Sequence, residues 1–325
     1  MKKLLVLCLF LAAGNIFAGG RRAASNFDSH LPQSPQPILD EHESPDLTEI
    51  LPAPDDEPSW AEQVMKALAA AHPRRIERVE FRYGDWAVFL RGAWYYYAGG
   101  KLLPEYLLED AAVYNPQPFY NYRSELPAWT APAPQEASRL REMTNNRYRN
   151  QPRRSPHFYD DLWRMHNDKE AYQRVKSIRF LGRSIMVHYA ILEDLSLVED
   201  RILELAKTDS QVQSWINNIS TIDAWNWRNI ANTQTRSFHA YGLAVDILPK
   251  SLGGRETYWL WAAGRNLEWW NIPYSGRFHP PEAVIKAFES YGFVWGGKWL
   301  LFDTMHFEYR PEIMILSGME LETLR

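Results

Sequence analysis

The sequence SFHAYGLAVD occupies residues 237–246, and DTMHFEY follows near the end of the chain at residues 303–309. Apolar and other residues alternate along the second half of each stretch, which is the period-two pattern of a half-buried β-strand. The alternation places Asp246 on one face of the first strand, and His306 and Glu308 on one face of the second, with the apolar residues turned to the core. We therefore predict two strands that each present polar side chains on a single face.

The polar residues of these stretches form a set that is typical of a catalytic zinc site. His239 precedes Asp246 by seven residues, too far for one helical turn, and Gly242 between them permits a tight backbone bend before the strand. Two imidazoles and one carboxylate can hold Zn²⁺ while leaving a fourth position for water, whose pKa the ion lowers to roughly 7. Asp303 stands three residues before His306 and could accept a proton from that water.

The pattern S-x-H-x-x-G-x-A-x-D, followed by D-x-x-H, resembles that of the D-alanyl-D-alanine carboxypeptidase and L-alanyl-D-glutamate endopeptidase family of zinc peptidases. Members of that family trim the peptide stems of bacterial cell wall. Matched position by position, the resemblance implies His239, Asp246 and His306 as zinc ligands and Asp303 as general base. It covers roughly residues 175 to 312.

The resemblance also implies an arginine upstream of the first motif, which stabilises the oxyanion on the attacked carbonyl. Arg228, in the sequence NWRNI, is our candidate, and Arg236 is a weaker one. Arg228 could instead be a surface arginine.

Glu308 competes with Asp303 for the role of base, because it shares a strand face with His306. We favour Asp303, because the family places its base three residues before the last ligand. A spacing of two along a strand separates side chains by about 7 Å, which suits a residue that orients the ligand rather than one that takes the proton.

Three further residues near the motifs are candidates for substrate binding. Ser237 could bond the substrate or orient His239, and the sequence does not separate the two roles. Tyr241 and Trp295 could line the cleft or could simply pack in the core.

The start of the chain has the pattern of an export signal. Residues 1–18 combine a charged beginning with an apolar run that is shorter than the ~20 residues of a membrane span, although an uncleaved anchor is an alternative. Cys8 is the only cysteine, so a cleaved chain would carry no thiol; a lipoprotein is a weaker alternative. We expect an exported protein of the periplasm or cell envelope.

Composition divides the rest into three parts. Residues 19–57 are rich in Pro and acidic residues and are expected to form a disordered linker. Residues 58–130 are expected to form an accessory module, with a helix over 60–71 and a β-meander, whose role in wall attachment, partner binding or covering the cleft stays open. Residues 131–325 are the predicted catalytic domain, with helices over 189–206 and 280–292 and an arginine cluster at 139–154 that is either a solvated face or a partner surface.

The expected strands and helices predict an α+β fold, and the resemblance implies that an antiparallel sheet carries the zinc site on one face and helices on the other. The expected function is zinc-dependent cleavage of peptidoglycan stem peptides, with the D-alanyl-D-alanine carboxypeptidase activity favoured over the L-alanyl-D-glutamate endopeptidase activity. The competing hypothesis is a non-catalytic, metal-bearing wall-binding module, as in the hedgehog signalling domain that resembles these peptidases. A net charge of −4 argues against a nucleic-acid binder, and the sequence gives no oligomeric state.

Overall fold

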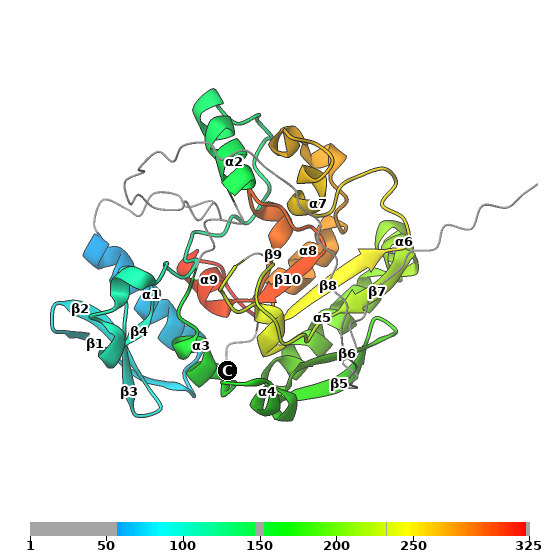
Figure 1. Cartoon of the computed structure of the whole chain (residues 1–325). Helices are drawn as coiled ribbons and strands as arrows, with labels where there is room; N and C mark the ends of the chain where they lie inside the picture. Colours follow the sequence, from blue (N-terminus) through cyan, green and yellow to red (C-terminus); the bar gives the residue numbers. More distant parts are fainter. Residues whose placement is uncertain (1–56, 147–152, 232, 323–325) are drawn as a thin grey trace, which may run out of the picture. The chain divides into compact units, whose positions relative to one another are not determined.

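The computed structural model describes residues 57–146, 153–231 and 233–322. The predicted signal peptide, and the predicted linker up to residue 56, lie outside the described residues. Within the described part, the predicted α+β fold is confirmed, with strands paired in antiparallel sheets and helices packed against them (Figure 1). None of the helices described is both long and apolar enough to span a bilayer.

The sheet that carries the motif residues has four strands in the order β7 (Ile219–Asp223), β8 (Ala244–Pro249), β10 (His306–Tyr309) and β9 (Phe293–Trp295). All neighbouring pairs in it are antiparallel. The register pairs His306 directly with Asp246 across β10 and β8. Because directly paired residues project from the same face of a sheet, the two sequence motifs meet side by side.

The opposite face of this sheet is covered by two helices, α5 (Leu192–Leu205) and α8 (Glu282–Glu289). The ring of Phe307 in β10 stacks on that of Phe288 in α8, with centroids 3.8 Å apart, and both are fully buried. Each such side chain removed from water contributes about 1.5–3 kcal/mol. Since neighbouring strand residues point to opposite faces, packing of Phe307 on α8 directs His306 to the other side.

A hairpin of β5 (Val175–Phe180) and β6 (Arg183–His188) joins this core, and its end is tied to the first motif. Gly242 ends the short 3₁₀ turn η4 (Phe238–Tyr241) with φ of +65°, and its carbonyl accepts from the amide of His188 at 2.8 Å. A Cβ at Gly242 would lie 2.7 Å from that amide nitrogen. The glycine of the motif is therefore required both by its backbone conformation and by this close approach.

The N-terminal part consists of α1 (Glu57–Ala71) and a meander of β1 (Ile76–Arg82), β2 (Asp85–Leu90), β3 (Ala93–Tyr96) and β4 (Leu103–Pro104). The helix begins three residues before the predicted start. It packs on β2 and also on α9 (Pro311–Leu316), which follows β10. After the meander comes a connecting strap, residues 115–126, whose Phe119, Tyr120 and Tyr122 are buried in the same hydrophobic cluster as Phe307.

A smaller cluster lies between α2 (Pro134–Asn146) and α7 (Trp259–Ala263) and includes Leu140, Trp269 and Phe302. Arg147 and Arg149 of the predicted arginine cluster fall outside the described residues. The remaining short elements are α3 (His157–Trp163), α4 (Asp168–Arg174), α6 (Ser210–Asn218), and the 3₁₀ turns η1 (Glu105–Leu107), η2 (Ala111–Val113), η3 (Tyr189–Ile191), η5 (Trp269–Asn271), η6 (Tyr274–Gly276) and η7 (Gly296–Lys298).

Candidate metal centre

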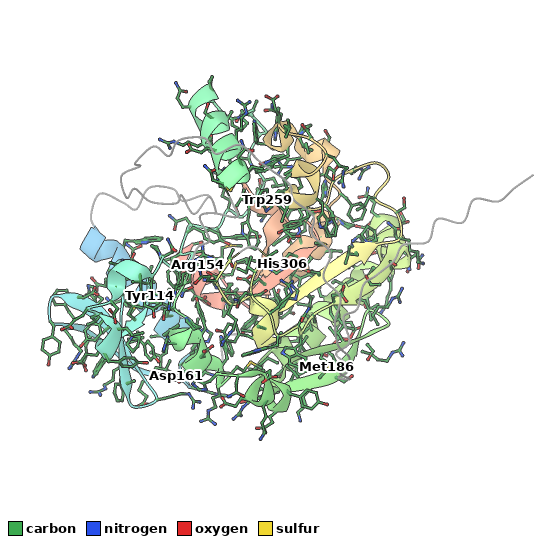
Figure 2. All side chains as sticks on the ribbon, in the orientation of Figure 1. Tyr114, Arg154, Asp161, Met186, Trp259 and His306 are labelled. Carbon is green, nitrogen blue, oxygen red and sulfur yellow. The ribbon has the colours of Figure 1, made fainter. Side chains whose placement is uncertain are left out.

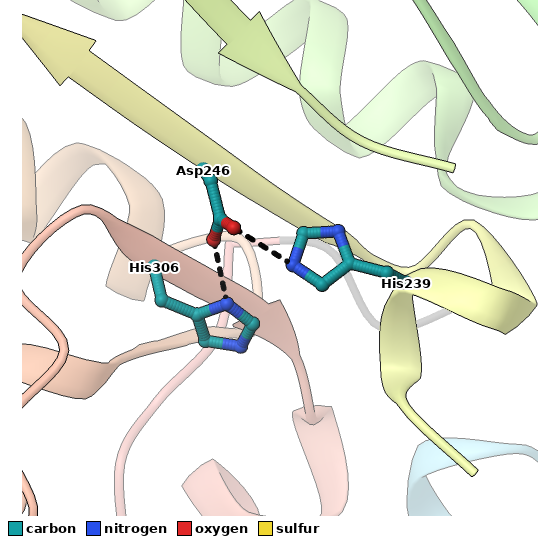
Figure 3. Close-up of side chains that lie close together, drawn as sticks. All are labelled: His239, Asp246 and His306. Carbon is teal, nitrogen blue, oxygen red and sulfur yellow. Dashed lines mark hydrogen bonds and ion pairs between the residues drawn. The ribbon is translucent and has the colours of Figure 1, made fainter. Parts of the chain in front are cut away.

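His239, Asp246 and His306 converge on the face of the sheet opposite α8. Asp246 lies between the two imidazoles, with Oδ2 3.2 Å from His239 Nε2 and Oδ1 2.8 Å from His306 Nδ1 (Figure 3). Figure 2 shows the His306 side chain among those of the surrounding strands and helices. One ligand atom from each residue lies within 4.8 Å of the others, which makes the three a candidate metal site.

The donor atoms suit a tetrahedral zinc ion. Two donors, each about 2.1 Å from zinc, lie about 3.4 Å apart at the tetrahedral angle, close to the 3.2 Å between His239 and Asp246. His239 Nδ1 bonds to the carbonyl of Ala224 at 2.5 Å, which assigns the ring hydrogen to Nδ1 and leaves the lone pair on Nε2. Nε2 itself is buried without a hydrogen-bond partner. A buried, unpaired nitrogen that faces a carboxylate is the position that a cation would satisfy.

His306 is held in the complementary way. Its Nε2 lies 3.1 Å from Glu308 Oε2 and its Nδ1 lies 2.8 Å from Asp246 Oδ1, so each ring nitrogen faces a carboxylate. A metal ion bound at Nδ1 would take the place of the hydrogen there, while Glu308 accepts the hydrogen on Nε2. The side chains of His306 and Glu308 are therefore closer to each other than the roughly 7 Å expected from strand spacing alone. Glu308 is placed to orient His306.

The local charges change the pKa values of these groups. Burial acts to raise the pKa of Asp246, but the adjacent imidazoles of His239 and His306 outweigh it and hold the pKa well below its usual range. Burial acts to lower the pKa of His306, yet its bonds to Asp246 and Glu308 raise it well above the usual value. The cluster therefore stabilises positive charge between its carboxylates.

Asp303 lies beside this cluster on the loop before β10. Burial, followed by the nearby charge of Asp246, raises the pKa of Asp303 to about 8, and a bound divalent cation would act in the opposite direction. Its Oδ1 is buried without a hydrogen-bond partner. The loop that carries Asp303 can lie close to residue 296 because that residue is glycine: a Cβ there would lie 2.6 Å from the Asp303 carbonyl oxygen.

The two candidate arginines have different surroundings. Arg228 is exposed, and its charge acts to lower the pKa of Asp303. Arg236 forms an ion pair with Asp160, donates to the carbonyl of Met165 at 3.2 Å and lies over the ring of Trp227. Arg236 is therefore engaged in the fold, which leaves Arg228 as the better placed of the two.

The three candidate substrate-binding residues are all buried. Ser237 is 5% exposed, and its hydroxyl accepts from the His239 amide at 3.3 Å, which fits the orienting role. Tyr241 is 2% exposed and donates to Asp160 at 2.7 Å. Trp295 is 1% exposed, shares a strand face with Phe307 and donates to the Thr304 carbonyl at 3.0 Å. Substrate contact by these residues stays a prediction, and the positions of Tyr241 and Trp295 favour packing.

The structure adds two residues that the sequence did not single out. The ring of Trp299 lies 5.6 Å from that of His306, and its indole nitrogen donates to the hydroxyl of Tyr120 at 2.8 Å. Arg310 donates to Glu308 at 3.1 Å. Extending the period-two pattern one step beyond Glu308 would have indicated Arg310, whereas no local pattern marks Trp299.

Comparison with known protein families agrees with this geometry. Residues 231–309, which include the three candidate ligands and Asp303, match the model of a family described as D-alanyl-D-alanine carboxypeptidase. Residues 64–119 match the model of a domain of unknown function. No curated protein and no solved structure matches the chain. The first match supports placing this part of the chain in the M15 peptidase family, as the motif resemblance implied.

Proposed function

We propose that this protein is an exported, zinc-dependent peptidase that cleaves peptidoglycan stem peptides as a D-alanyl-D-alanine carboxypeptidase. One observation carries the proposal. Within the matched segment, His239, Asp246 and His306 each offer one ligand atom within 4.8 Å of the others, and the buried Nε2 of His239 has no hydrogen-bond partner.

The side chains divide the chemistry among them. When bound by the three ligands, zinc supplies Lewis-acid polarisation and a water of lowered pKa. Asp303 accepts the proton of the attacking water and delivers it to the leaving amine, a role that suits a buried carboxyl group with an unpaired oxygen. Arg228, an exposed side chain whose charge acts on Asp303, is the candidate to stabilise the oxyanion.

The export and the substrate rest on other grounds. The apolar run at residues 4–13, after two lysines, supports export. The family description supports a peptide that ends in D-alanyl-D-alanine. Cleavage between L-alanine and D-glutamate, and binding without cleavage, are the alternatives that the experiment must separate.

The test is incubation of the zinc-loaded chain with purified muropeptides that have intact pentapeptide stems, followed by mass spectrometry. We expect loss of one terminal D-alanine, abolished by chelation and absent in His239→Ala. Cleavage of the stem between L-alanine and D-glutamate would show that the protein is an endopeptidase and not a carboxypeptidase. Binding of a muropeptide with no cleavage of any linkage would refute the peptidase and leave the wall-binding module.

A further inference from the structure

A chain of charged side chains leads from the candidate metal centre toward the N-terminal part of the protein. Glu308 contacts His306 through Oε2 and accepts from Arg310 through Oε1 at 3.1 Å. Arg310 in turn donates from Nε to Glu312 at 2.5 Å. Glu308 is thus held between the candidate ligand and a guanidinium group.

Arg310 is 2% exposed and its donors are directed to four acceptors. Besides the two carboxylates, one terminal nitrogen donates to the Pro118 carbonyl at 3.2 Å and to the Tyr159 hydroxyl at 3.3 Å. The planar guanidinium fork fixes these bonds in one plane, which a lysine ammonium cannot reproduce. Glu308 is therefore bonded by a group that is itself fixed from several directions.

Two of the groups around this network come from the region that matches the domain of unknown function. Pro118 belongs to the connecting strap. His72, just after α1, has its Nε2 3.7 Å from Glu312 Oε2, which is a contact beyond hydrogen-bond distance. α1 also packs directly on α9, the helix that begins after Arg310.

We propose that Arg310 is a positioning residue of the metal centre, which fixes Glu308 so that His306 keeps its hydrogen on Nε2 and presents Nδ1 to the ion. The N-terminal part, the predicted accessory module, contributes to this positioning because the Pro118 carbonyl of the strap accepts a hydrogen bond from Arg310. The module is then a structural component of the metal centre, not only an attachment or binding domain. This inference rests on the zinc site of the proposed function, but it requires only metal binding and not peptidase activity.

Arginine also stabilises folds, so the test needs a readout that folding alone does not change. We choose zinc affinity in the full-length chain, measured by competition with a chromophoric chelator, together with the ¹⁵N shift of His306 Nε2 in the zinc-loaded chain, which reports the hydrogen bond to Glu308. Groups that hold a histidine ligand typically contribute 10–100-fold to metal affinity. Arg310→Lys should weaken zinc binding by about that factor and shift the ¹⁵N resonance of His306 Nε2 in the zinc-loaded chain, because the hydrogen bond of Nε2 to Glu308 is then less well held.

A matched control is Glu289→Gln, which breaks another buried ion pair, with Lys298, that has no contact with the ligands. It should lower the melting temperature without changing zinc affinity. Tyr159→Phe removes one hydroxyl from Arg310 and keeps the ring, so it should fold and give a loss below tenfold. In a Glu308→Gln background, Arg310→Lys should have no further effect on zinc affinity, because Arg310 acts through Glu308.

The results separate this inference from the proposed function. If the unmutated chain binds zinc and Arg310→Lys binds it as tightly, the positioning role is wrong and the zinc peptidase stands. If Arg310→Lys does not fold, unchanged zinc affinity in Tyr159→Phe overturns the inference. Equal losses from Arg310→Lys with and without Glu308→Gln would also overturn it. Failure of the unmutated chain to bind zinc would remove the ligand assignment itself.

Discussion

Two buried clusters of charged residues in this protein differ in how completely their polar atoms are paired. In one, Lys298 bonds Glu289 and the carbonyls of Arg123 and Ser124, while Tyr122 donates to Glu289. No buried side-chain nitrogen or oxygen of Lys298, Glu289 or Tyr122 lacks a partner. In the other cluster, at the candidate metal centre, His239 Nε2 and Asp303 Oδ1 have no hydrogen-bond partner, although His239 Nε2 lies 3.2 Å from Asp246 Oδ2. Complete pairing fits a role in folding, and unpaired buried atoms beside three potential metal ligands fit a place for a metal ion.

The largest effect that this comparison predicts is the loss of metal. His239→Ala or His306→Ala removes one of three protein ligands, and zinc affinity should fall by orders of magnitude. Elemental analysis of the purified chain should give about one zinc before substitution and almost none afterwards. Full retention of zinc in both variants would contradict the ligand assignment.

The next largest effect distinguishes the general base from the metal ligands. Asp303→Ala should keep zinc but lose about 10²–10⁴-fold in muropeptide hydrolysis, because removal of a general base affects turnover. Zinc content and hydrolysis are measured on the same sample. Glu308→Ala is the comparison: if it abolishes hydrolysis with zinc retained, while Asp303→Ala stays active, Glu308 is the base.

The candidate metal centre could be predicted from sequence because the resemblance implied its ligands and a local rule placed two of them on one face of the sheet. Alternation along residues 305–309 placed Phe307 on the core face and His306 on the other, and the sheet has that arrangement. Pairing of His306 with Asp246 then needs only that β8 and β10 are neighbours. The alternation and the spacing of apolar residues predicted strands and helices, and the family resemblance implied their arrangement around an antiparallel sheet.

The paired cluster could not be predicted in this way. Tyr122 lies in a Pro-rich stretch without periodicity, 167 residues from Glu289, so nothing local indicates their contact. The same is true of Pro118 and Arg310, which are 192 residues apart. Such contacts depend on where the strap crosses the sheet domain, which long-range packing decides.

Breaking the fully paired cluster of Lys298, Glu289 and Tyr122 should lower stability without changing zinc affinity. Glu289→Gln leaves Lys298 charged and buried, and loss of one partner of a buried pair costs about 3–5 kcal/mol. Urea unfolding of the zinc-loaded protein measures the change in free energy of unfolding. A parallel loss of zinc affinity would show that the two clusters are not independent.

We expect Glu312 to make a smaller contribution to the free energy of unfolding, and one that depends on pH. Burial acts to raise its pKa, but Arg310 outweighs burial and lowers it from 4.5 to about 2. The unfolded chain then binds the proton more tightly, so the stabilisation is complete above pH 4.5 and is lost as pH falls toward 2. At 1.36 kcal/mol per unit, the contribution is about 3 kcal/mol. In Glu312→Gln, the free energy of unfolding, measured by urea unfolding at several pH values, should depend less on pH over this range. The same pH dependence in the variant and the unmutated chain would contradict the assignment.

The smallest effect distinguishes the two roles left open for Ser237. Its hydroxyl accepts from the His239 amide at the start of η4, and loss of such a cap typically costs about 1 kcal/mol. If Ser237 orients His239, Ser237→Ala should weaken zinc binding by about fivefold, since 1 kcal/mol is nearly that factor, and leave KM for muropeptides unchanged at saturating zinc. If Ser237 instead bonds the substrate, KM should rise and zinc affinity should stay the same. Ser237→Thr is the control, because it keeps the hydroxyl and should restore zinc affinity only in the first case. The buried position of Ser237, at 5% exposure, favours that outcome.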